Sequence, residues 1–312
     1  MKKSQIEIVA FFLGFSVNEV LDLSKKAPVS YFRFEIPKKN GGMRAIFHPS
    51  KETKALQYAL IETLLRKLKV HSSAIAYIPG KKSPLKINAL MHCPYKYSVR
   101  IDFQNFFPSI RPNDLVPIIE QEHGALSNQE IEFLSNSLFV RFKGGAKGLA
   151  IGAPSSPWIC NIIMNKLDKE INRVANQVSS DSVYTRYADD LVFSTNVRGA
   201  CREFVRQVSL LLQRTQSPML KINPQKTVFL SRKNKRMVTG IILDSAGAIS
   251  LGRNNKRYVR KLIFEYKNQK ITPEQKAYLR GYLGFSRDIE PDFYNRLAIK
   301  YGASLLHEII RN

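Results

Sequence analysis

The chain has 312 residues, of which 44% are hydrophobic and 24% charged, a globular composition that excludes a disordered, collagen-like or coiled-coil protein. Lysine and arginine number 49 against 25 acidic residues, which gives a formal net charge of +24. That charge exceeds what a small-molecule enzyme needs and predicts a polyanionic partner, most simply nucleic acid. Three widely separated cysteines argue against a zinc site or disulfide framework and favour a reducing cytoplasm.

The first part of the chain predicts a helix followed by a basic hairpin. Residues 1–30 form a short helical extension, with Ile8, Phe11, Phe12 and Phe15 on one apolar face. Its apolar run is much shorter than the ~20 residues of a membrane span, so we expect no membrane association. The alternation at 31–37 and the return at 43–47 predict two strands, and the residues between them form a glycine-rich, basic tip. A helix is expected at 53–70 and a strand at 97–102.

The second part mixes strands and helices without regular alternation. The remaining helices are predicted at 113–124, 127–139, 157–178, 199–213 and from about 253 onward. A strand, a tight turn and a second strand are expected at 182–195, and a further strand at 238–243. This order favours an α+β fold over a doubly wound sheet.

Two acidic segments carry the strongest chemical signal. In Tyr184–Ser194 the adjacent acids Asp189 and Asp190 lie at or beside the predicted turn. Strand alternation points them in different directions, so that only one can face a given site squarely. In Ile101–Pro108, Asp102 ends a strand and aromatic residues follow it. A solvated turn or a strand-end acid explains either segment alone, but together they place carboxylates at two strand ends of a strongly basic chain.

Acids in a nucleic-acid cleft would repel phosphate unless cations lay between them. Two carboxylates that hold two Mg²⁺ ions about 3.5–4 Å apart meet this need. Mg²⁺ prefers hard oxygen ligands, namely a few carboxylates plus substrate phosphates. We therefore predict a site for two Mg²⁺ ions, with Mn²⁺ as the alternative ion.

The segments at Asp102 and at 187–190 resemble the palm motifs of reverse transcriptases, and the similarity extends from the hairpin near Lys38 to about Leu243. The resemblance implies an α+β right-hand polymerase, an RNA-directed DNA polymerase in which the primer hydroxyl attacks a deoxynucleotide and pyrophosphate departs. Its implied parts are an N-terminal extension at 1–30, fingers with part of the palm at 31–100, the palm with interleaved fingers helices at 101–243, and a basic helical thumb at 244–312. The residues that it assigns to catalysis and metal binding are Asp102, Phe103, Asp189, Asp190 and Lys226.

Other positions match the nucleotide-binding residues of that family. Arg44 on the hairpin matches the fingers arginine that grips the triphosphate, with Lys38 or Lys39 assisting. Phe107 lies five residues after Asp102, at the place of the aromatic steric gate. A ring there would clash with a ribose 2′-hydroxyl and favour deoxynucleotides.

Three further positions are compared with the family pattern, and only Lys226 carries two interpretations. Gly152 is expected to allow close backbone approach to the nucleotide. Ile151 stands where the family usually has glutamine, so the usual amide contact is absent. Lys226 matches a lysine proposed as the general acid for pyrophosphate, but one more surface lysine explains it equally well.

Two short segments narrow the family further. Asn88–His92 and Val238–Gly240 resemble the NAxxH and VTG signatures of bacterial retron reverse transcriptases, in the same order around the catalytic motifs. In the helix from about 253, apolar residues at i, i+3, i+4 and i+7 face the core and turn the cations outward to a phosphate backbone. The residues predicted to bind RNA are Asn88, His92, Val238, Thr239, Gly240, Arg253, Lys256, Arg257, Arg260 and Lys261.

The resemblance also implies a set of partners. They are deoxynucleoside triphosphates, a cognate structured noncoding RNA, the DNA copied from it, host ribonuclease H and an accessory effector protein. Synthesis would start from a guanosine 2′-hydroxyl and give a branched RNA–DNA hybrid in the bacterial cytoplasm, with a role in anti-phage defence.

Three alternatives remain open. A group-II-intron-like or diversity-generating reverse transcriptase would share the catalytic motifs without retron priming. A non-catalytic RNA-binding protein on a polymerase fold is disfavoured by the intact Asp102, Asp189 and Asp190. A DNA-templated or template-independent polymerase on the same palm would be recognised by its template preference.

Overall fold

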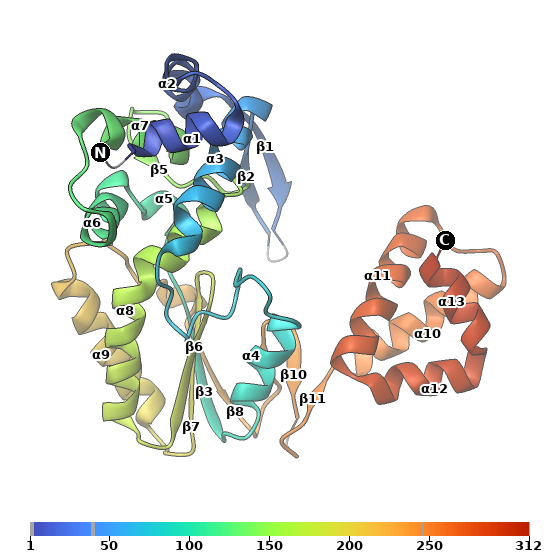
Figure 1. Ribbon diagram of the computed structural model, residues 1–312. Coiled ribbons are helices and arrows are strands. Elements are labelled where there is room, and N and C mark those ends of the chain that lie inside the picture. The colour runs from blue at the N-terminus through green and yellow to red at the C-terminus, as the bar shows by residue number, and fades with distance from the viewer. Residues whose placement is uncertain (1–2, 39–40, 245, 312) are drawn as a thin grey trace.

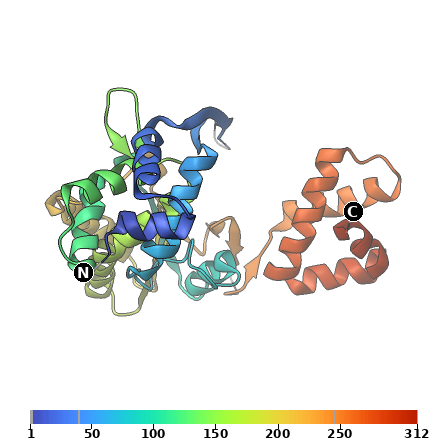
Figure 2. The ribbon, with the colours of Figure 1, turned by 45° about the horizontal axis from the view of Figure 1, so that its top comes forward.

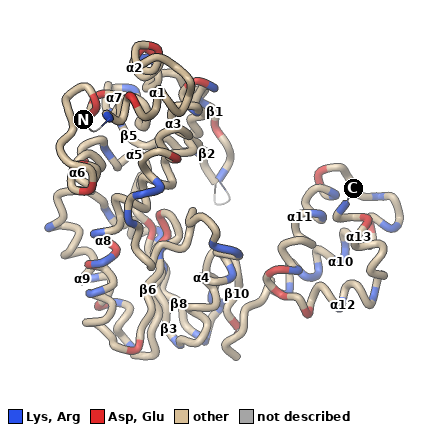
Figure 3. The backbone as a smooth tube through the Cα atoms, viewed as in Figure 1, with Lys and Arg blue, Asp and Glu red and all other residues tan. Residues whose placement is uncertain are grey.

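The computed structural model describes residues 3–38, 41–244 and 246–311, which form two bodies (Figure 1). The larger body contains the chain up to the last strand, and a smaller helical body lies beside it in both views (Figures 1 and 2). The helices of the smaller body are α10 (Arg253–Lys267), α11 (Pro273–Ile289), α12 (Pro291–Tyr301) and α13 (Ala303–Arg311). Lysine and arginine are spread over both bodies (Figure 3). No helix of the described residues is both long and apolar enough to cross a membrane.

A four-stranded antiparallel sheet forms the centre of the larger body. Its strands, in spatial order, are β6 (Ser182–Tyr187), β7 (Asp190–Thr195), β3 (Tyr97–Asp102) and β8 (Val228–Ser231). Along β7, Leu191 and Phe193 face a core shared with α8 (Ser156–Val178) and α9 (Ala200–Arg214), where Phe193 stacks on Phe204 with ring centroids 4.2 Å apart. Val192 faces the other way, toward α4 (Pro84–His92). Helices therefore cover both faces of the sheet, and its open end is left for the acidic residues.

The N-terminal part packs on the same core. Its helices are α1 (Gln5–Leu13), α2 (Val17–Lys26), α3 (Lys51–Thr63), α5 (Phe106–Ser109), α6 (Pro112–His123) and α7 (Asn128–Leu138). Two hairpins accompany them, β1 (Tyr31–Pro37) with β2 (Met43–Pro49) and β4 (Val140–Arg141) with β5 (Lys147–Gly148). Short 3₁₀ turns lie at η1 (Ala27–Val29), η2 (Leu65–Lys67) and η3 (Pro224–Lys226).

The apolar face predicted for the first helix is wrong. Ile6, Val9 and Ala10 are buried, whereas Phe11 is 82% exposed and Phe12 is 52% exposed. The reason is that α1 packs on α3 through the side opposite to these rings, and it ends at Leu13, so that Phe15 does not belong to it.

The strand predicted at 238–243 is instead a hairpin of β9 (Arg236–Val238) and β10 (Ile241–Leu243). Thr239 and Gly240 form its two-residue loop, with φ of 47° and 84°, as a type I′ turn requires. β10 then pairs with β11 (Ile249–Ser250). The boundary predicted at 243/244 therefore falls between two paired strands rather than in a linker.

Candidate active site

A cavity of about 580 Å³ lies beside the open end of the sheet. Its walls come from β2, from the loop after β3, from the loop before α8, from the β6–β7 turn and from η3. The sequence-predicted residues that line it are Lys38, Arg44, Phe103, Phe107, Ile151, Gly152, Asp189 and Lys226. Lys39 lies outside the described residues. Residues far apart in the chain thus meet in one pocket that is large enough for a nucleotide.

Three carboxylates converge at the rim of this cavity. Asp102 at the end of β3 is directly opposite Asp190 at the start of β7, which places their side chains on one face of the sheet. Burial, followed by the charge of Asp102, raises the pKa of Asp189. Burial, then the charges of Asp189 and Asp102, raise the pKa of Asp190 to about 6. The charge of Asp102 therefore raises the pKa of both adjacent acids. Strand alternation had predicted that only one of them could face the site squarely.

Lys226 lies next to these acids. Its Nζ is 2.8 Å from Asp102 Oδ1, and the Asn223 amide donates to the Asp102 carbonyl at 2.8 Å. The loop that carries the lysine is thus fixed to the end of β3. This placement favours a role at the site over that of a remote surface lysine.

The loop before α8 is anchored to the β1–β2 hairpin. The Phe47 amide donates to the Ile151 carbonyl at 2.8 Å. Gly152 has φ of 111°, and a Cβ there would lie 2.9 Å from Ile46 Cγ2. A glycine is therefore required at position 152 because β2 lies so close. The sequence had suggested that close approach of the nucleotide was the reason. Arg44 lies on this same strand.

The aromatic residues after Asp102 are layered. Phe103 stacks on Phe106 with centroids 5.6 Å apart, and Phe106 meets Phe107 edge-on at 5.5 Å. Phe106 is buried, whereas Phe107 is half-buried and lines the cavity. Phe106 therefore belongs to the core, whereas Phe107 has the cavity-facing position expected from the sequence.

Tyr77 was missed by the sequence reasoning. It is half-exposed, has φ of 58° and lines the cavity. Burial, with smaller contributions from Tyr187 and Asp189, raises the pKa of its hydroxyl. A parallel bridge between Ala74 and Arg186 brings this segment to the site. Nothing in the local sequence signals such a long-range bridge.

The comparisons with known proteins agree with this geometry. The reverse transcriptase (RNA-dependent DNA polymerase) family matches residues 36–279. Retron Ec83 reverse transcriptase of Escherichia coli is 36% identical over 92% of both chains. The chain belongs to the retron reverse transcriptases. Retron Ec73 reverse transcriptase is 32% identical over 88% of both chains, and retron Ec86 reverse transcriptase 30% identical over 95% of both, each also from Escherichia coli.

This reverse transcriptase therefore has the right-hand polymerase fold of its family and is a retron RNA-directed DNA polymerase. Among solved structures, a telomerase from Candida tropicalis with telomeric RNA is 13% identical over 92% of this chain and 59% of that chain, with a TM-score of 0.49. That likeness is too loose to add to the argument.

The acidic end of the sheet fits the divalent metal ions that reverse transcriptases use. The donors are carboxylate oxygens, and burial, followed by the charges of neighbouring acids, raises the pKa values of Asp189 and Asp190. Within the described residues, no three or more acidic, histidine or cysteine side chains are placed so that together they could hold a metal ion. A Mg²⁺-type site needs only one or two carboxylates, because substrate phosphates and water complete the coordination.

The NAxxH segment of this reverse transcriptase lies inside the protein. Asn88 and His92 are 0% exposed, and the His92 ring nitrogens lie 2.8 Å from Ser194 Oγ and 2.7 Å from Thr185 Oγ1. Thr185 also donates to Asn88 Oδ1 at 2.6 Å. The RNA contact expected of these two residues is thus replaced by an internal network that fastens α4 to β6 and β7.

The VTG segment meets the NAxxH segment. Val238 is 0% exposed and shares a core with Ala89 and Cys93 of the α4 end, while Thr239 Oγ1 donates to the Leu85 carbonyl at 3.4 Å. Only the Thr239–Gly240 turn reaches solvent. The expected RNA contact of Val238 is therefore excluded by its burial, and the two signatures form one junction.

The five cations predicted on the last helices divide into two groups. Arg253, Arg257 and Lys261 are exposed and, at a spacing of four, share one face of α10. Lys256 pairs with Glu290 and lies 5.5 Å from the Phe293 ring, and Arg260 lies 5.2 Å from the same ring. Lys256 and Arg260 therefore contact Glu290, which precedes α12, and Phe293 within α12 rather than face solvent.

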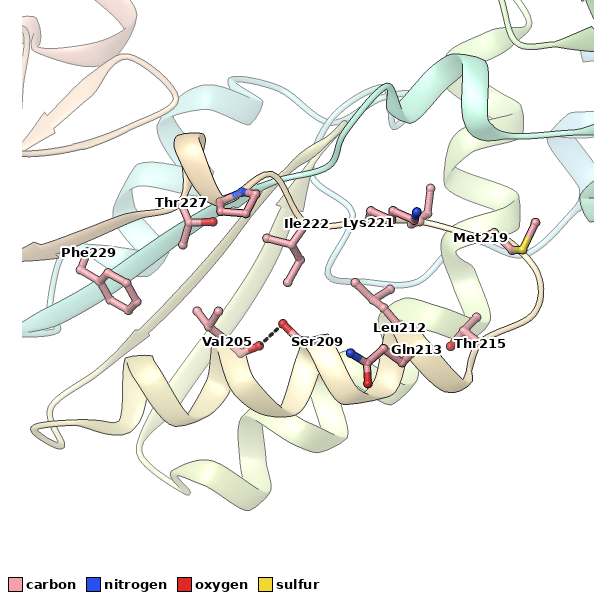
Figure 4. A pocket seen from close by; sticks show the side chains of 12 residues that line it. Val205, Ser209, Leu212, Gln213, Thr215, Met219, Lys221, Ile222, Thr227 and Phe229 are labelled. Atoms are coloured by element: carbon pink, nitrogen blue, oxygen red, sulfur yellow. Dashed lines mark hydrogen bonds between the residues drawn. The ribbon is translucent and has the colours of Figure 1, made fainter.

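A second cavity, of about 730 Å³, lies between α9 and residues 219–229 (Figure 4). Apolar side chains such as Leu212 and Ile222 line it, and Ser209 is bonded within α9 to the Val205 carbonyl at 2.8 Å. None of the predicted site residues lines this cavity. The catalytic chemistry therefore belongs to the smaller cavity.

Proposed function

We propose that this enzyme copies part of a cognate structured noncoding RNA into single-stranded DNA, starting from a guanosine 2′-hydroxyl. The observation that carries the proposal is the convergence of Asp102, Asp189 and Asp190 beside a cavity lined by the predicted nucleotide-binding residues. The similarity to three retron reverse transcriptases supports retron-type priming.

In this proposal two Mg²⁺ ions, with Mn²⁺ as a substitute, are held by Asp102 and Asp189 together with the neighbouring Phe103 and Asp190. When bound, the ions lower the pKa of the attacking hydroxyl and neutralise charge in the transition state. A bound cation would offset both the burial and the neighbouring acidic charges that raise the pKa values of Asp189 and Asp190.

The cavity residues would orient the deoxynucleoside triphosphate. Arg44 and Lys38 come from the fingers hairpin and would bind its phosphates, as a guanidinium and an ammonium can. Phe107 would exclude a ribose 2′-hydroxyl. Lys226, with Nζ beside Asp102, would hold the proton that neutralises departing pyrophosphate.

The larger parts take the roles expected from the sequence. Residues 31–100 would serve as fingers with part of the palm, residues from 101 through the strand junction as palm with interleaved fingers helices, and α10–α13 as thumb, with 1–30 as an N-terminal extension. The exposed row of Arg253, Arg257 and Lys261 would track the RNA backbone, and the Thr239–Gly240 turn would touch RNA at the palm edge. We also propose host ribonuclease H and an accessory effector protein as partners. The proposed role is anti-phage defence, and the proposed location is the bacterial cytoplasm.

The test is to express the protein with its neighbouring chromosomal sequence in bacteria and to analyse the nucleic acid that copurifies. Treatment with ribonuclease, deoxyribonuclease and a debranching enzyme should reveal a short DNA joined to RNA through a debranchable 2′–5′ bond. The Asp189→Asn variant is the control, and it should yield the RNA without the DNA. Linear DNA in place of the branched product would overturn the priming step while leaving the polymerase activity intact.

A further inference from the structure

The turn between β6 and β7 is strained. Ala188 has φ of 58° in the left-handed region, although it carries a Cβ. That conformation is unfavourable for a non-glycine residue, so it persists only where surrounding contacts hold it. The next residue is Asp189, and the contacts that hold Ala188 therefore also determine the position of this carboxylate.

The contact comes from a buried arginine. Arg186 Nη1 donates to the Ala188 carbonyl at 3.0 Å and to Asn161 Oδ1 at 3.0 Å. On its other side, the guanidinium donates to both carboxylate oxygens of Asp168 at 2.7–3.1 Å. Arg186 and Asp168 are both 0% exposed. A planar guanidinium bonded in this way on two sides has one orientation.

The same arginine also fixes a second wall of the cavity. Its backbone amide donates to the Ser73 carbonyl at 2.7 Å, and its carbonyl accepts from the Ile75 amide at 2.9 Å. Asn161 Nδ2 donates to the Ala76 carbonyl at 2.9 Å, directly before Tyr77. The Arg186 side chain thus joins the catalytic turn to α8, and the Arg186 backbone and the Asn161 side chain hold the segment that carries Tyr77.

A contribution to stability alone does not explain this arrangement. Desolvating two charges costs several kcal/mol, and apolar residues of similar volume often stabilise a core equally well. What a buried, fully bonded ion pair supplies beyond that is a defined geometry.

We infer that Arg186 is a positioning residue of the polymerase reaction: oriented by Asp168 and Asn161, it holds the Ala188 carbonyl and so places the Asp189 carboxylate for metal binding. Arg186 itself touches neither metal nor nucleotide. The inference rests on the proposed role of Asp189 as a metal ligand.

The test compares two conservative variants. Arg186→Lys keeps a positive charge beside Asp168 but cannot bond Asn161 and Ala188 together. For the full-length protein free of nucleic acid, the dissociation constant of Mn²⁺ is measured by the loss of the free-ion electron paramagnetic resonance signal. Loss of a group that orients a metal ligand lowers metal affinity about 10-fold or more. We expect that change in this variant, and a parallel rise in the Mg²⁺ concentration that gives half-maximal primer extension.

Tyr184→Phe is the matched control. The Tyr184 hydroxyl donates to the same Asp168 carboxylate at 2.7 Å and is equally buried, but it makes no bond to the turn. This variant should lower the melting temperature and leave the Mn²⁺ dissociation constant unchanged.

An unchanged Mn²⁺ dissociation constant in Arg186→Lys, with a lowered melting temperature, would reduce Arg186 to a structural residue and overturn the inference. If Arg186→Lys does not fold, Asn161→Ala decides in the same way, because it removes the other support of Nη1. Asp189→Asn tests the underlying proposal separately. Mn²⁺ binding as tight as in the unsubstituted protein would show that Asp189 is not a ligand.

Discussion

The acidic end of the palm sheet and the junction of α4 with the β9–β10 hairpin present two kinds of buried polar group. At the acidic end, Asp189 and Asp190 are half-buried near a third carboxylate, and burial followed by neighbouring acidic charges raises their pKa values. At the junction, His92 is fully buried and has hydrogen-bond partners on both ring nitrogens. A cation bound at the acidic end would add to the charge that Lys226 supplies beside Asp102, whereas the His92 ring already has both of its partners.

This difference separates a ligand site from a structural network more reliably than the presence of a sequence signature does. Both regions contain signature residues of the family. The acidic end borders the cavity that the predicted nucleotide-binding residues line, and a bound cation there would relieve the repulsion between the carboxylates.

Replacing Asp189 with asparagine is expected to have the largest effect. Loss of one preorganised electrostatic group lowers turnover about 100-fold or more. Because the Asp189 carboxylate is buried beside like charges, the metal-free variant should melt at the same temperature as the unsubstituted protein or higher. Primer extension and differential scanning calorimetry measure the two effects, and Asp102→Asn should repeat the loss of turnover. Near-normal extension by either variant would remove the metal-binding role.

Replacing His92 should show the opposite combination. His92→Ala leaves the hydroxyls of Ser194 and Thr185 unpaired around a cavity, which should cost about 3 kcal/mol in the free energy of unfolding. Turnover per folded molecule, and RNA affinity, should remain. A large loss of RNA affinity in a fully folded variant would restore the RNA-contact interpretation.

The pH dependence of the free energy of unfolding also tests whether His92 is a structural residue. Burial lowers the pKa of His92 from 6.5 to about 3, so the unfolded chain binds a proton there that the folded chain does not. Its contribution to stability is therefore complete above pH 6.5 and is lost toward pH 3, by about 1.4 kcal/mol per pH unit. Denaturant melts of the unsubstituted protein and His92→Gln should differ by this slope.

Phe107→Ala should have a moderate effect on sugar selection. Its half-buried ring lines the cavity, and steric selection by one side chain is worth about 10- to 100-fold. The ratio of kcat/KM for deoxynucleotides over ribonucleotides should fall by about that factor, with Phe106→Leu as the core-facing control. Unchanged selectivity would leave Phe107 as a packing residue.

The smallest effect is expected on the thumb. Arg253→Gln with Arg257→Gln should weaken RNA binding and reduce the slope of log K against log salt by about 0.7 for each lost contact with a single strand. Lys256→Gln is the matched control, since that lysine is already paired with Glu290. Equal slopes for the unsubstituted protein, the double variant and Lys256→Gln would mean that the exposed cations of α10 contact only solvent.

Much of the fold was predictable because its signals are local. The strands at 97–102 and 182–195 and the long helix α8 follow from periodicity and turn residues, and the structure has them within a residue or two. The hairpin at 236–243 was missed because Thr239 is an unusual residue at positive φ. The buried face of the first helix was predicted wrongly because phenylalanine is usually a core residue, whereas the phenylalanines of this helix are exposed.

The site was predictable where a residue type has one chemical use. Two acids at strand ends in a basic chain indicate metal ions, and the structure brings them together. Burial was the part that the sequence could not supply: His92 and Lys256 are turned inward by partners far along the chain, Ser194 and Glu290. Tyr77 was overlooked because a bridge between distant segments brings it to the site. Arg186 was overlooked because the side chains that orient it, Asp168 and Asn161, belong to α8.

The apolar cluster that begins at Ala89 and Cys93 continues through β9 and β10 into the thumb helices, ending at Leu306 and Ile309. This continuity limits how such enzymes can be recombined. A chimaera joined at residue 244 would pair β10 of one parent with β11 of another. A joint after Leu251 would exchange the four helices and keep the whole strand junction from a single parent, so it is the better place to join the helical body of one enzyme to the catalytic palm of another.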